Sequence, residues 1–178
     1  MRSGRPADAI SYLDELSQLA PIDPSVYVDR GRAEIYSRQF SAANNDLAKA
    51  LTLKPDNPYL VIWRHIGRQR ADENDAQEFV GNAERLNKTK WPWPVIALLL
   101  GLSDPQSVHE AVQSGDSPRV RLERGCEADF YVAVYDLGRN VKDDALKLLQ
   151  SAALRCPENF VEEAAAKLEL ARLKVQTH

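Results

Sequence analysis

The clearest pattern of apolar and polar residues in the chain lies between residues 27 and 55. Apolar side chains in the second half of this segment recur at intervals of three and four residues, which places them on one face of a helix. These positions are Ala43, Leu47, Ala50 and Leu51. Pro55 ends that helix, because proline lacks an amide donor and disfavours helix in the residue before it. The segment is therefore predicted to form a helix, a short turn at residues 38–41 and a second helix that ends before the proline.

The same pattern recurs along the chain at a fixed interval. Pro21 and Pro55 are 34 residues apart, and Pro157 follows Pro55 by 102 residues, three times that interval. Small or apolar residues occupy three further positions of this register. They are Ala9, Ala43 and Ala145; Leu13, Leu47 and Leu149; and Leu16, Ala50 and Ala152. Small residues allow two helices to approach closely and the larger ones fill the space beside them, so the register predicts repeated helix pairs.

This register resembles that of the tetratricopeptide-repeat (TPR) family. The best match consists of Tyr27, Gly31, Phe40, Ala43, Leu47, Ala50 and Pro55, and a second one of Ala133, Ala145, Leu149, Ala152 and Pro157. The resemblance implies an all-α fold in which helix pairs stack into an α-α superhelix, a TPR solenoid.

On this basis residues 1–178 form a single TPR-like domain with a degenerate central region. We expect residues 6–20 to be the second helix of a repeat without its partner, and residues 24–57 to be a full repeat. Residues 58–125 correspond to two degenerate repeats, 126–157 to another repeat and 160–175 to a capping helix. Within the degenerate region, Ser103-Asp104-Pro105 is typical of a helix start, with Asp or Ser as the cap and proline at the first helical position.

The two ends of this array need different explanations. A helix over residues 6–20 would expose an apolar face made by Ile10, Leu13 and Leu16, which further chain or a second subunit would cover. The sequence therefore allows a homodimer through this helix. At the other end, polar residues surround an apolar stripe of Ala164, Leu168 and Ala171, as in a helix that seals a solenoid. Glu163 and Lys167 are spaced to pair on its surface.

Composition excludes several classes of partner. Apolar residues make up 44% of the chain and charged residues 28%, and the net charge is −3, which gives no field that attracts nucleic acid. The longest apolar run, Val95 to Leu100, is too short to cross a bilayer. Met1 is followed by a polar stretch containing proline, so we expect no signal peptide in this chain.

No motif of catalysis stands out. His65, His109 and His178 do not have metal-binding spacing with the two cysteines, and there is no phosphate loop or recognisable nucleophile motif. We therefore expect a protein that is not an enzyme and needs no cofactor or metal. Arg30 and Asp46 fall on facing helices of one repeat. An ion pair within the repeat is favoured over a contact of Arg30 with a ligand.

The two cysteines leave two interpretations open. In the TPR register Cys126 is the first residue of one helix, and Cys156 directly precedes the proline that ends the next. Because the two helices run antiparallel, these ends should be neighbours, which favours a disulfide and an exported protein. The alternative is a pair of buried thiols in a reducing cytosol.

The first helices of the repeats are expected to line a concave surface that binds a peptide or a protein segment. Its candidate residues are Val28, Arg32, Tyr36, Tyr59, Ile62, Ile66, Arg70 and Phe130. Aromatic, aliphatic and arginine side chains suit such a groove. The alternative is that some of them pack against the additional central helices.

A narrower resemblance concerns the last 90 residues or so. Trp91-Pro92 leading into Val95-Ile96, Cys126-Glu127-Ala128 with Phe130-Tyr131, and Cys156-Pro157 with Phe160 and Glu163 are similar to the NlpI-like group of bacterial TPR lipoproteins. That likeness implies an envelope adaptor and favours the periplasm over the cytoplasm, although a lipidated cysteine is missing here. Two other hypotheses remain open: a self-association module, and a regulatory domain of a larger protein.

Overall fold

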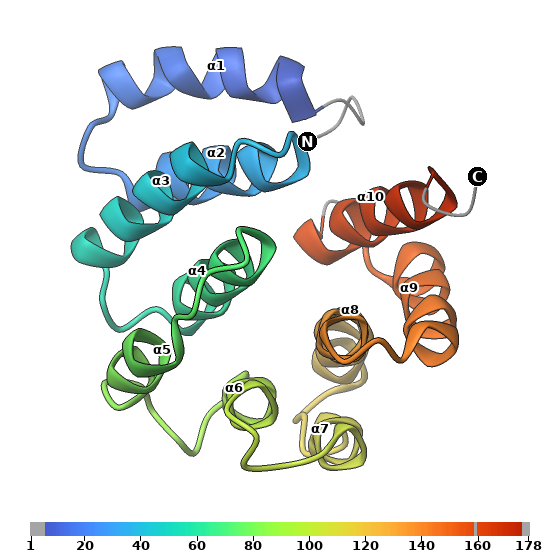
Figure 1. Cartoon of the computed structure of the whole chain (residues 1–178). Helices are drawn as coiled ribbons and strands as arrows, with labels where there is room; N and C mark the ends of the chain where they lie inside the picture. Colours follow the sequence, from blue (N-terminus) through green and yellow to red (C-terminus); the bar gives the residue numbers. More distant parts are fainter. Residues whose placement is uncertain (1–5, 159, 176–178) are drawn as a thin grey trace. The chain divides into compact units, whose positions relative to one another are not determined.

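The computed structural model describes residues 6–158 and 160–175, and this part of the chain is all-α, as expected, with ten helices and no strand (Figure 1). The helices are α1 Pro6–Leu19, α2 Pro24–Tyr36, α3 Phe40–Leu53, α4 Pro58–Arg70, α5 Ala76–Ala83, α6 Trp93–Leu99, α7 Pro105–Val112, α8 Pro118–Gly138, α9 Lys142–Arg155 and α10 Val161–Val175. The start of the chain, where no signal peptide is expected, and His178 lie outside the described residues.

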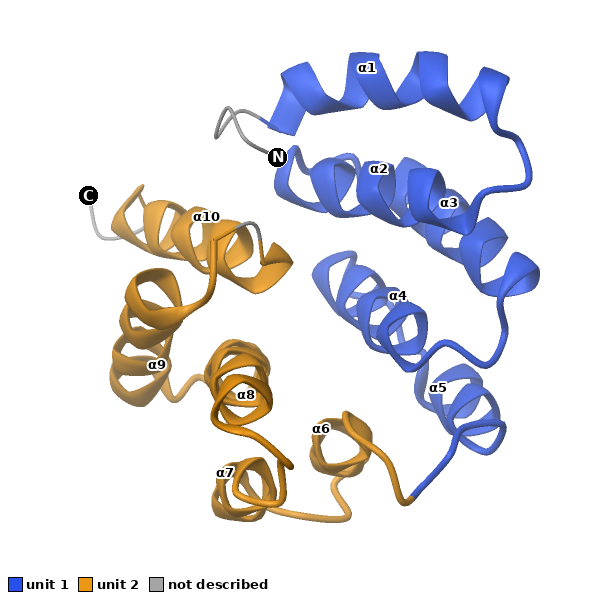
Figure 2. Cartoon of the chain, turned by 180° about the vertical axis from the view of Figure 1, so that it is seen from behind, with its two compact units in different colours: residues 1, 3–88 blue, residues 2, 89–178 orange. Residues whose placement is uncertain are grey.

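The chain divides into two compact units, which Figure 2 shows in different colours. Unit 1 ends at Lys88 and holds α1 to α5. Unit 2 begins at Thr89 and holds α6 to α10. Each unit is described below by itself.

Four of the helices begin at a polar capping residue followed by proline. The side-chain oxygen of the cap accepts a hydrogen bond from a backbone N–H of the first turn, and proline has no N–H that would need one there. The four pairs are Asp23-Pro24, Asn57-Pro58, Asp104-Pro105 and Ser117-Pro118. The helix start predicted at Ser103-Asp104-Pro105 is confirmed, and Asp104 is the cap.

Helix bounds repeat at the interval seen in the sequence. The 14-residue helices α1 and α3 begin 34 residues apart, and so do the 13-residue helices α2 and α4. α9, also of 14 residues, begins 102 residues after α3. The turns after α2, α4 and α8 each hold a residue with positive φ, and these residues, Arg38, Asp72 and Asn140, keep the same register. The backbone therefore follows the 34-residue period in both units.

Leu47 of α3 lies at the centre of unit 1, fully buried between α2 and α4. A Cβ added at Gly31 of α2 would be 2.8 Å from Leu47 Cγ, and one added at Gly67 of α4 would be 3.1 Å from Leu47 Cδ1. The two glycines thus make room for one leucine from opposite sides. Ala43 and Ala50, predicted on the same face, are also fully buried.

The expectation of an exposed apolar face on the first helix is wrong. α1 packs along α2, which buries Leu13 and partly buries Ile10 and Leu16. The large apolar side chains that stay exposed in this region are Tyr12, Leu19 and Ile22.

In unit 2, α8 pairs with α9, and Ala145, Leu149 and Ala152 are fully buried, as their register predicts. α8 begins at Pro118 and not at residue 126, because Ser117 caps it with a hydrogen bond from the amide of Val120. Cys126 therefore lies inside α8, not at the first residue of a helix. The degenerate region before α8 contains α4 and the three short helices α5, α6 and α7.

The helix predicted at the carboxyl end is present as α10, which packs on α9 and α8. The predicted stripe is not its buried face, since Ala171 is exposed and Ala164 and Leu168 are only partly buried. The buried residues are Glu162, Ala165, Ala166 and Glu169. Small alanines allow close packing there, and both glutamates have hydrogen-bond donors, so this face is compatible with burial. The predicted pair of Glu163 and Lys167 forms, at 2.5 Å.

Candidate functional site

The eight side chains predicted to line a peptide groove differ in accessibility. α2 carries Val28, Arg32 and Tyr36, α4 carries Tyr59, Ile62, Ile66 and Arg70, and α8 of unit 2 carries Phe130. Five of them are buried: Val28, Arg32, Ile62, Ile66 and Phe130. Tyr36, Tyr59 and Arg70 are partly exposed. In this conformation a ligand would therefore reach three of the eight.

Arg32 serves the packing of α2 on α4. Its guanidinium lies 4.8 Å from the ring centroid of Trp63, a fully buried residue of α4, and its Nη1 donates to Asp29 at 3.1 Å. A cation against an aromatic face in a buried place is a favourable contact. Arg32 is thus a structural residue of unit 1. Its position in the repeat did not indicate this role.

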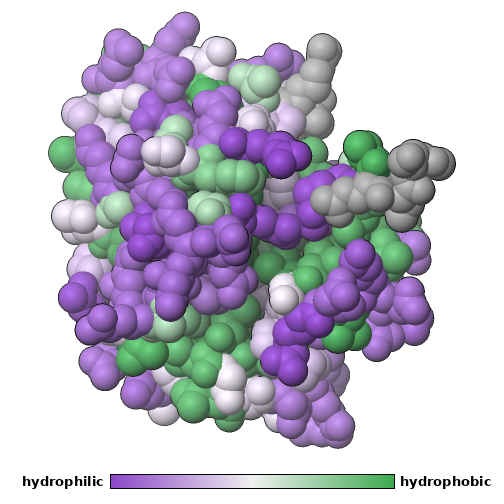
Figure 3. Space-filling view, in the orientation of Figure 1, coloured by the Kyte–Doolittle hydropathy of each residue, from purple (hydrophilic) through white to green (hydrophobic). Residues whose placement is uncertain are grey.

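The three partly exposed side chains are on two successive first helices of the repeat pattern. Tyr36 is the last residue of α2 and Arg70 the last of α4, 34 residues later, whereas Tyr59 lies in the first turn of α4. Tyrosine gives large contact area with little loss of conformational freedom, and arginine recognises carboxylates. The surface of α1, α2 and α3 on the face seen in Figure 3 is mostly hydrophilic.

Arg30 is the centre of a polar network in unit 1. Its Nε and Nη2 donate to the two carboxylate oxygens of Asp46 on α3, at 2.5 and 2.9 Å, so the ion pair predicted within the repeat is confirmed. Its Nη1 donates to Asp14 and Ser17 of α1, at 2.9 and 2.8 Å. Sequence reasoning missed these two residues, although their spacing of three places them on one side of a helix.

Glu34 lies one helical turn after Arg30 on α2 and is 5% exposed. Burial, reinforced by the negative charge of Asp46, raises the pKa of this carboxyl to about 7, and the positive charge of Arg30 only partly opposes the shift. No described residue donates a hydrogen bond to its Oε2. Nothing in the sequence marked this residue as buried, because a glutamate one turn from an arginine on a helix is usually solvated.

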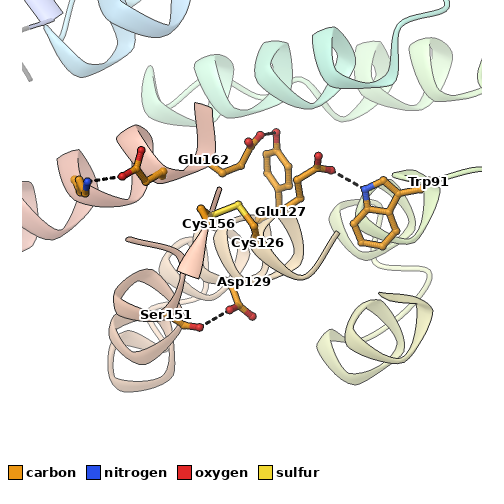
Figure 4. Close-up of a disulfide and its surroundings, with 10 residues drawn as sticks. Trp91, Cys126, Glu127, Asp129, Ser151, Cys156 and Glu162 are labelled. Atoms are coloured by element: carbon orange, nitrogen blue, oxygen red, sulfur yellow. Dashed lines mark hydrogen bonds and ion pairs between the residues drawn. A yellow bond between two sulfur atoms is a disulfide. The ribbon is translucent and has the colours of Figure 1, made fainter. Parts of the chain in front are cut away.

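Unit 2 contains a disulfide between Cys126 and Cys156, the pairing favoured by the register (Figure 4). It joins the middle of α8 to the residue directly after α9, across a Cα–Cα distance of 4.9 Å. Cys126 is buried and Cys156 is partly exposed. The bridge therefore closes the α8–α9 pair at its open end.

Glu127 and Tyr131 extend polar contacts from the same helix. Trp91 Nε1 donates to Glu127 at 2.6 Å, and Tyr131 donates its hydroxyl hydrogen to Glu162 of α10 at 2.7 Å. Figure 4 shows Glu127 pointing toward Trp91, while Asp129 points away on the other side of α8. These bonds tie α8 to the segment before α6 and to α10.

A serine, an aspartate and a histidine come together on α9, α8 and α7. Ser151 Oγ donates to Asp129 at 2.6 Å, and His109 Nδ1 lies 3.7 Å from the other oxygen of Asp129. In a hydrolase the serine hydroxyl bonds to the imidazole, which takes its proton. Here the hydroxyl bonds to the carboxylate, so this arrangement does not activate a nucleophile.

The described part of the chain has neither a cluster of metal ligands nor a membrane-spanning helix. No group of three or more His, Cys, Asp or Glu side chains there could hold a metal ion. No helix in that part is long and apolar enough to span a membrane. No model of a known protein family matches the chain.

Proposed function

We propose that this chain is a TPR-type scaffold, a non-catalytic adaptor that binds a peptide or protein segment on α2 and α4. The observation that carries the proposal is the 34-residue period of helix bounds, which α1 to α4 and α9 all follow. Stacked helix pairs of constant length form superhelices whose first helices present a continuous binding surface. An envelope location fits the disulfide, because such bonds persist in oxidising compartments.

The binding residues that we propose are Tyr36, Tyr59 and Arg70. They are the members of the predicted groove that solvent reaches in this structure. Two tyrosines and an arginine favour an extended segment with aromatic or acidic side chains. Arg32 supports this surface by joining α2 to Trp63 of α4, whereas Ile62 and Ile66 are buried.

The test is selection of peptides from a random display library on the immobilised protein, followed by measurement of Kd. We expect Tyr36→Ala and Arg70→Ala each to weaken binding about tenfold, since anchors of this type contribute roughly 1–2 kcal/mol. Tyr12→Ala, on the exposed side of α1, is the control and should bind as wild type. Urea unfolding of all variants should be nearly unchanged. Failure to enrich any peptide, or equal affinities in all variants, would contradict the proposal.

Self-association is the second candidate function. Tyr12, Leu19 and Ile22 are 63%, 81% and 80% exposed, and three large apolar side chains in one region favour contact with another protein surface. The solution mass separates the two candidates, because an adaptor that acts as a monomer leaves this region uncovered.

A further inference from the structure

One side of α10 carries apolar residues that solvent reaches. They recur at alternating intervals of three and four residues, the spacing of a helix face that packs along a second helix. These residues, the α10 stripe, are Val161, Ala164, Leu168, Ala171 and Val175. Val175 is 77% exposed, Ala171 is exposed, and the other three are only partly buried. The described part of the chain therefore does not cover this side of α10 completely.

The 34-residue register shows that the same side of other helices is covered. The residues 34 positions before Ala164 and Leu168 are Phe130 and Val134 of α8, which are 0% and 5% exposed. The equivalent residues of α2 and α4 are also buried, namely Val28, Arg32, Ile62 and Ile66. A further helix against the α10 stripe would give this side the coverage that it has elsewhere in the register.

The α10 stripe has the same composition in both directions from its centre. Outward from Leu168, an alanine comes first and a valine second on either side. An interface between two identical chains related by a two-fold axis must be complementary to itself. In two antiparallel copies of α10 centred on Leu168, leucine meets leucine, alanine meets alanine and valine meets valine. The alanines allow the two helices to approach closely.

The charges at the two ends of α10 favour the same arrangement. Its first turn contains Glu163 and its last turn contains Lys174. Eleven residues are about three helical turns, so both lie on one side of the stripe. Antiparallel packing places Glu163 level with Lys174 of the second copy, and the pair occurs twice. Lys167, nearest the two-fold axis, is bound to Glu163 of its own helix at 2.5 Å.

We propose that two copies of this chain associate through α10, in an antiparallel two-fold arrangement centred on Leu168. The helix has 15 residues and is about 22 Å long, so the interface is smaller than the roughly 1,200 Å² of an ordinary stable complex. The dimer is therefore reversible, with a Kd on the order of 10–100 µM. It uses neither the exposed side chains of α1 nor the proposed binding residues of α2 and α4, so it does not rest on the adaptor function.

The experiment is sedimentation of the protein between about 1 and 500 µM. We expect the mean mass to rise with concentration from 20.0 kDa toward twice that value. Leu168→Glu should raise the Kd at least about tenfold, because it places two carboxylates together at the two-fold axis. Ala171→Glu, at an exposed position of the stripe, has the same purpose if Leu168→Glu does not fold. Leu154→Glu, on α9 and 85% exposed, is the matched control and should associate as the wild type does.

Exchange of charges tests the direction of the two helices. Glu163→Lys and Lys174→Glu should each raise the Kd about threefold or more, since each places like charges level with one another. The two substitutions together should restore a Kd close to that of the wild type. A defect in the double variant as large as the sum of the single ones would contradict the antiparallel pairing.

Cross-linking provides a second test of the direction. Cys126 and Cys156 are joined to each other, so a short bifunctional maleimide reacts with an introduced thiol. Leu168→Cys should give a covalent dimer, whereas Val175→Cys should not, because the two copies of residue 175 lie about 21 Å apart along the antiparallel pair. Equal cross-linking of both variants would overturn the arrangement. A monomer at every concentration, or association that Tyr12→Glu abolishes and Leu168→Glu does not, would overturn the α10 interface itself.

Discussion

At the scale of single residues, the packing of unit 1 depends on two positions that have no side chain. Leu47 fills the space left by Gly31 on one helix and by Gly67 on another, so one leucine joins three helices. Gly81 of α5 is the opposite case, since an added Cβ there would have no neighbour within 4 Å. The two environments allow a matched comparison of the same substitution.

We expect Gly31→Ala to destabilise the protein by about 1 kcal/mol. Alanine gains about 1 kcal/mol of helix propensity, but overpacking against the buried branch point of Leu47 costs roughly 1–3 kcal/mol. Gly81→Ala should be neutral or stabilising by up to about 1 kcal/mol, because it gains the propensity without the overlap. Urea unfolding followed by circular dichroism measures both changes. If Gly31→Ala is as stable as Gly81→Ala, the close approach of α2 and α3 at Leu47 is wrong.

At the scale of elements, the sequence predicts helices whose buried face combines small and large apolar residues. The faces of α3 and α9 follow directly from this pattern, as does the start of α7, where a cap and a proline coincide. The start of α8 was not predicted, because the repeat register placed a helix start at residue 126 and Ser117 provides a stronger one.

Burial of polar residues explains the other differences at this scale. The buried face of α10 contains Glu162 and Glu169, which hydropathy alone assigns to solvent, and their donors come from Tyr131 and Arg172. The predicted groove shows the converse case, in which apolar residues expected to be accessible are buried. Ile62 and Ile66, four residues apart on α4, form an apolar face that serves a binding surface or a core equally well. Sequence therefore predicts the helices better than it predicts which of their faces solvent reaches.

Replacing both Cys126 and Cys156 with serine tests the contribution of the disulfide to the α8–α9 pair. The bridge spans a sequence separation of 30 residues, and closing a loop of that size in the unfolded chain stabilises the folded state by about 3–4 kcal/mol. We expect a loss of that order in urea unfolding. The wild type in reductant should lose a similar amount, and reductant should not affect the double variant. Equal stability of oxidised and reduced wild type would contradict this.

At the scale of the whole molecule, buried and exposed carboxyls respond to pH in opposite directions. Burial raises the pKa of Glu34 in unit 1, and burial together with the charge of Asp144 raises that of Asp136 in unit 2. The capping carboxyls Asp23 and Asp104 have their pKa lowered by hydrogen bonds from Ser25 and Ser107. A carboxyl whose pKa is raised on folding destabilises the fold when it ionises. A carboxyl whose pKa is lowered on folding destabilises the fold when it becomes protonated.

These opposite effects predict a maximum of stability in mildly acidic solution. Glu34 and Asp136 contribute fully to the free energy of unfolding below their ordinary pKa values of 4.5 and 3.8. This contribution is lost as pH rises through their higher pKa values in the folded state, about 7 for Glu34. The stabilising contribution of the capping carboxylates Asp23 and Asp104 is lost only as pH falls below their ordinary pKa of 3.8. We expect the free energy of unfolding to fall by about 1–3 kcal/mol between about pH 5 and 8. Urea unfolding across this range measures the decline, and combining Glu34→Gln with Asp136→Asn should flatten it. Stability that rises steadily toward pH 8, or a decline unchanged in the double variant, would mean that folding does not raise the pKa of these two carboxyls and that other groups determine the pH response.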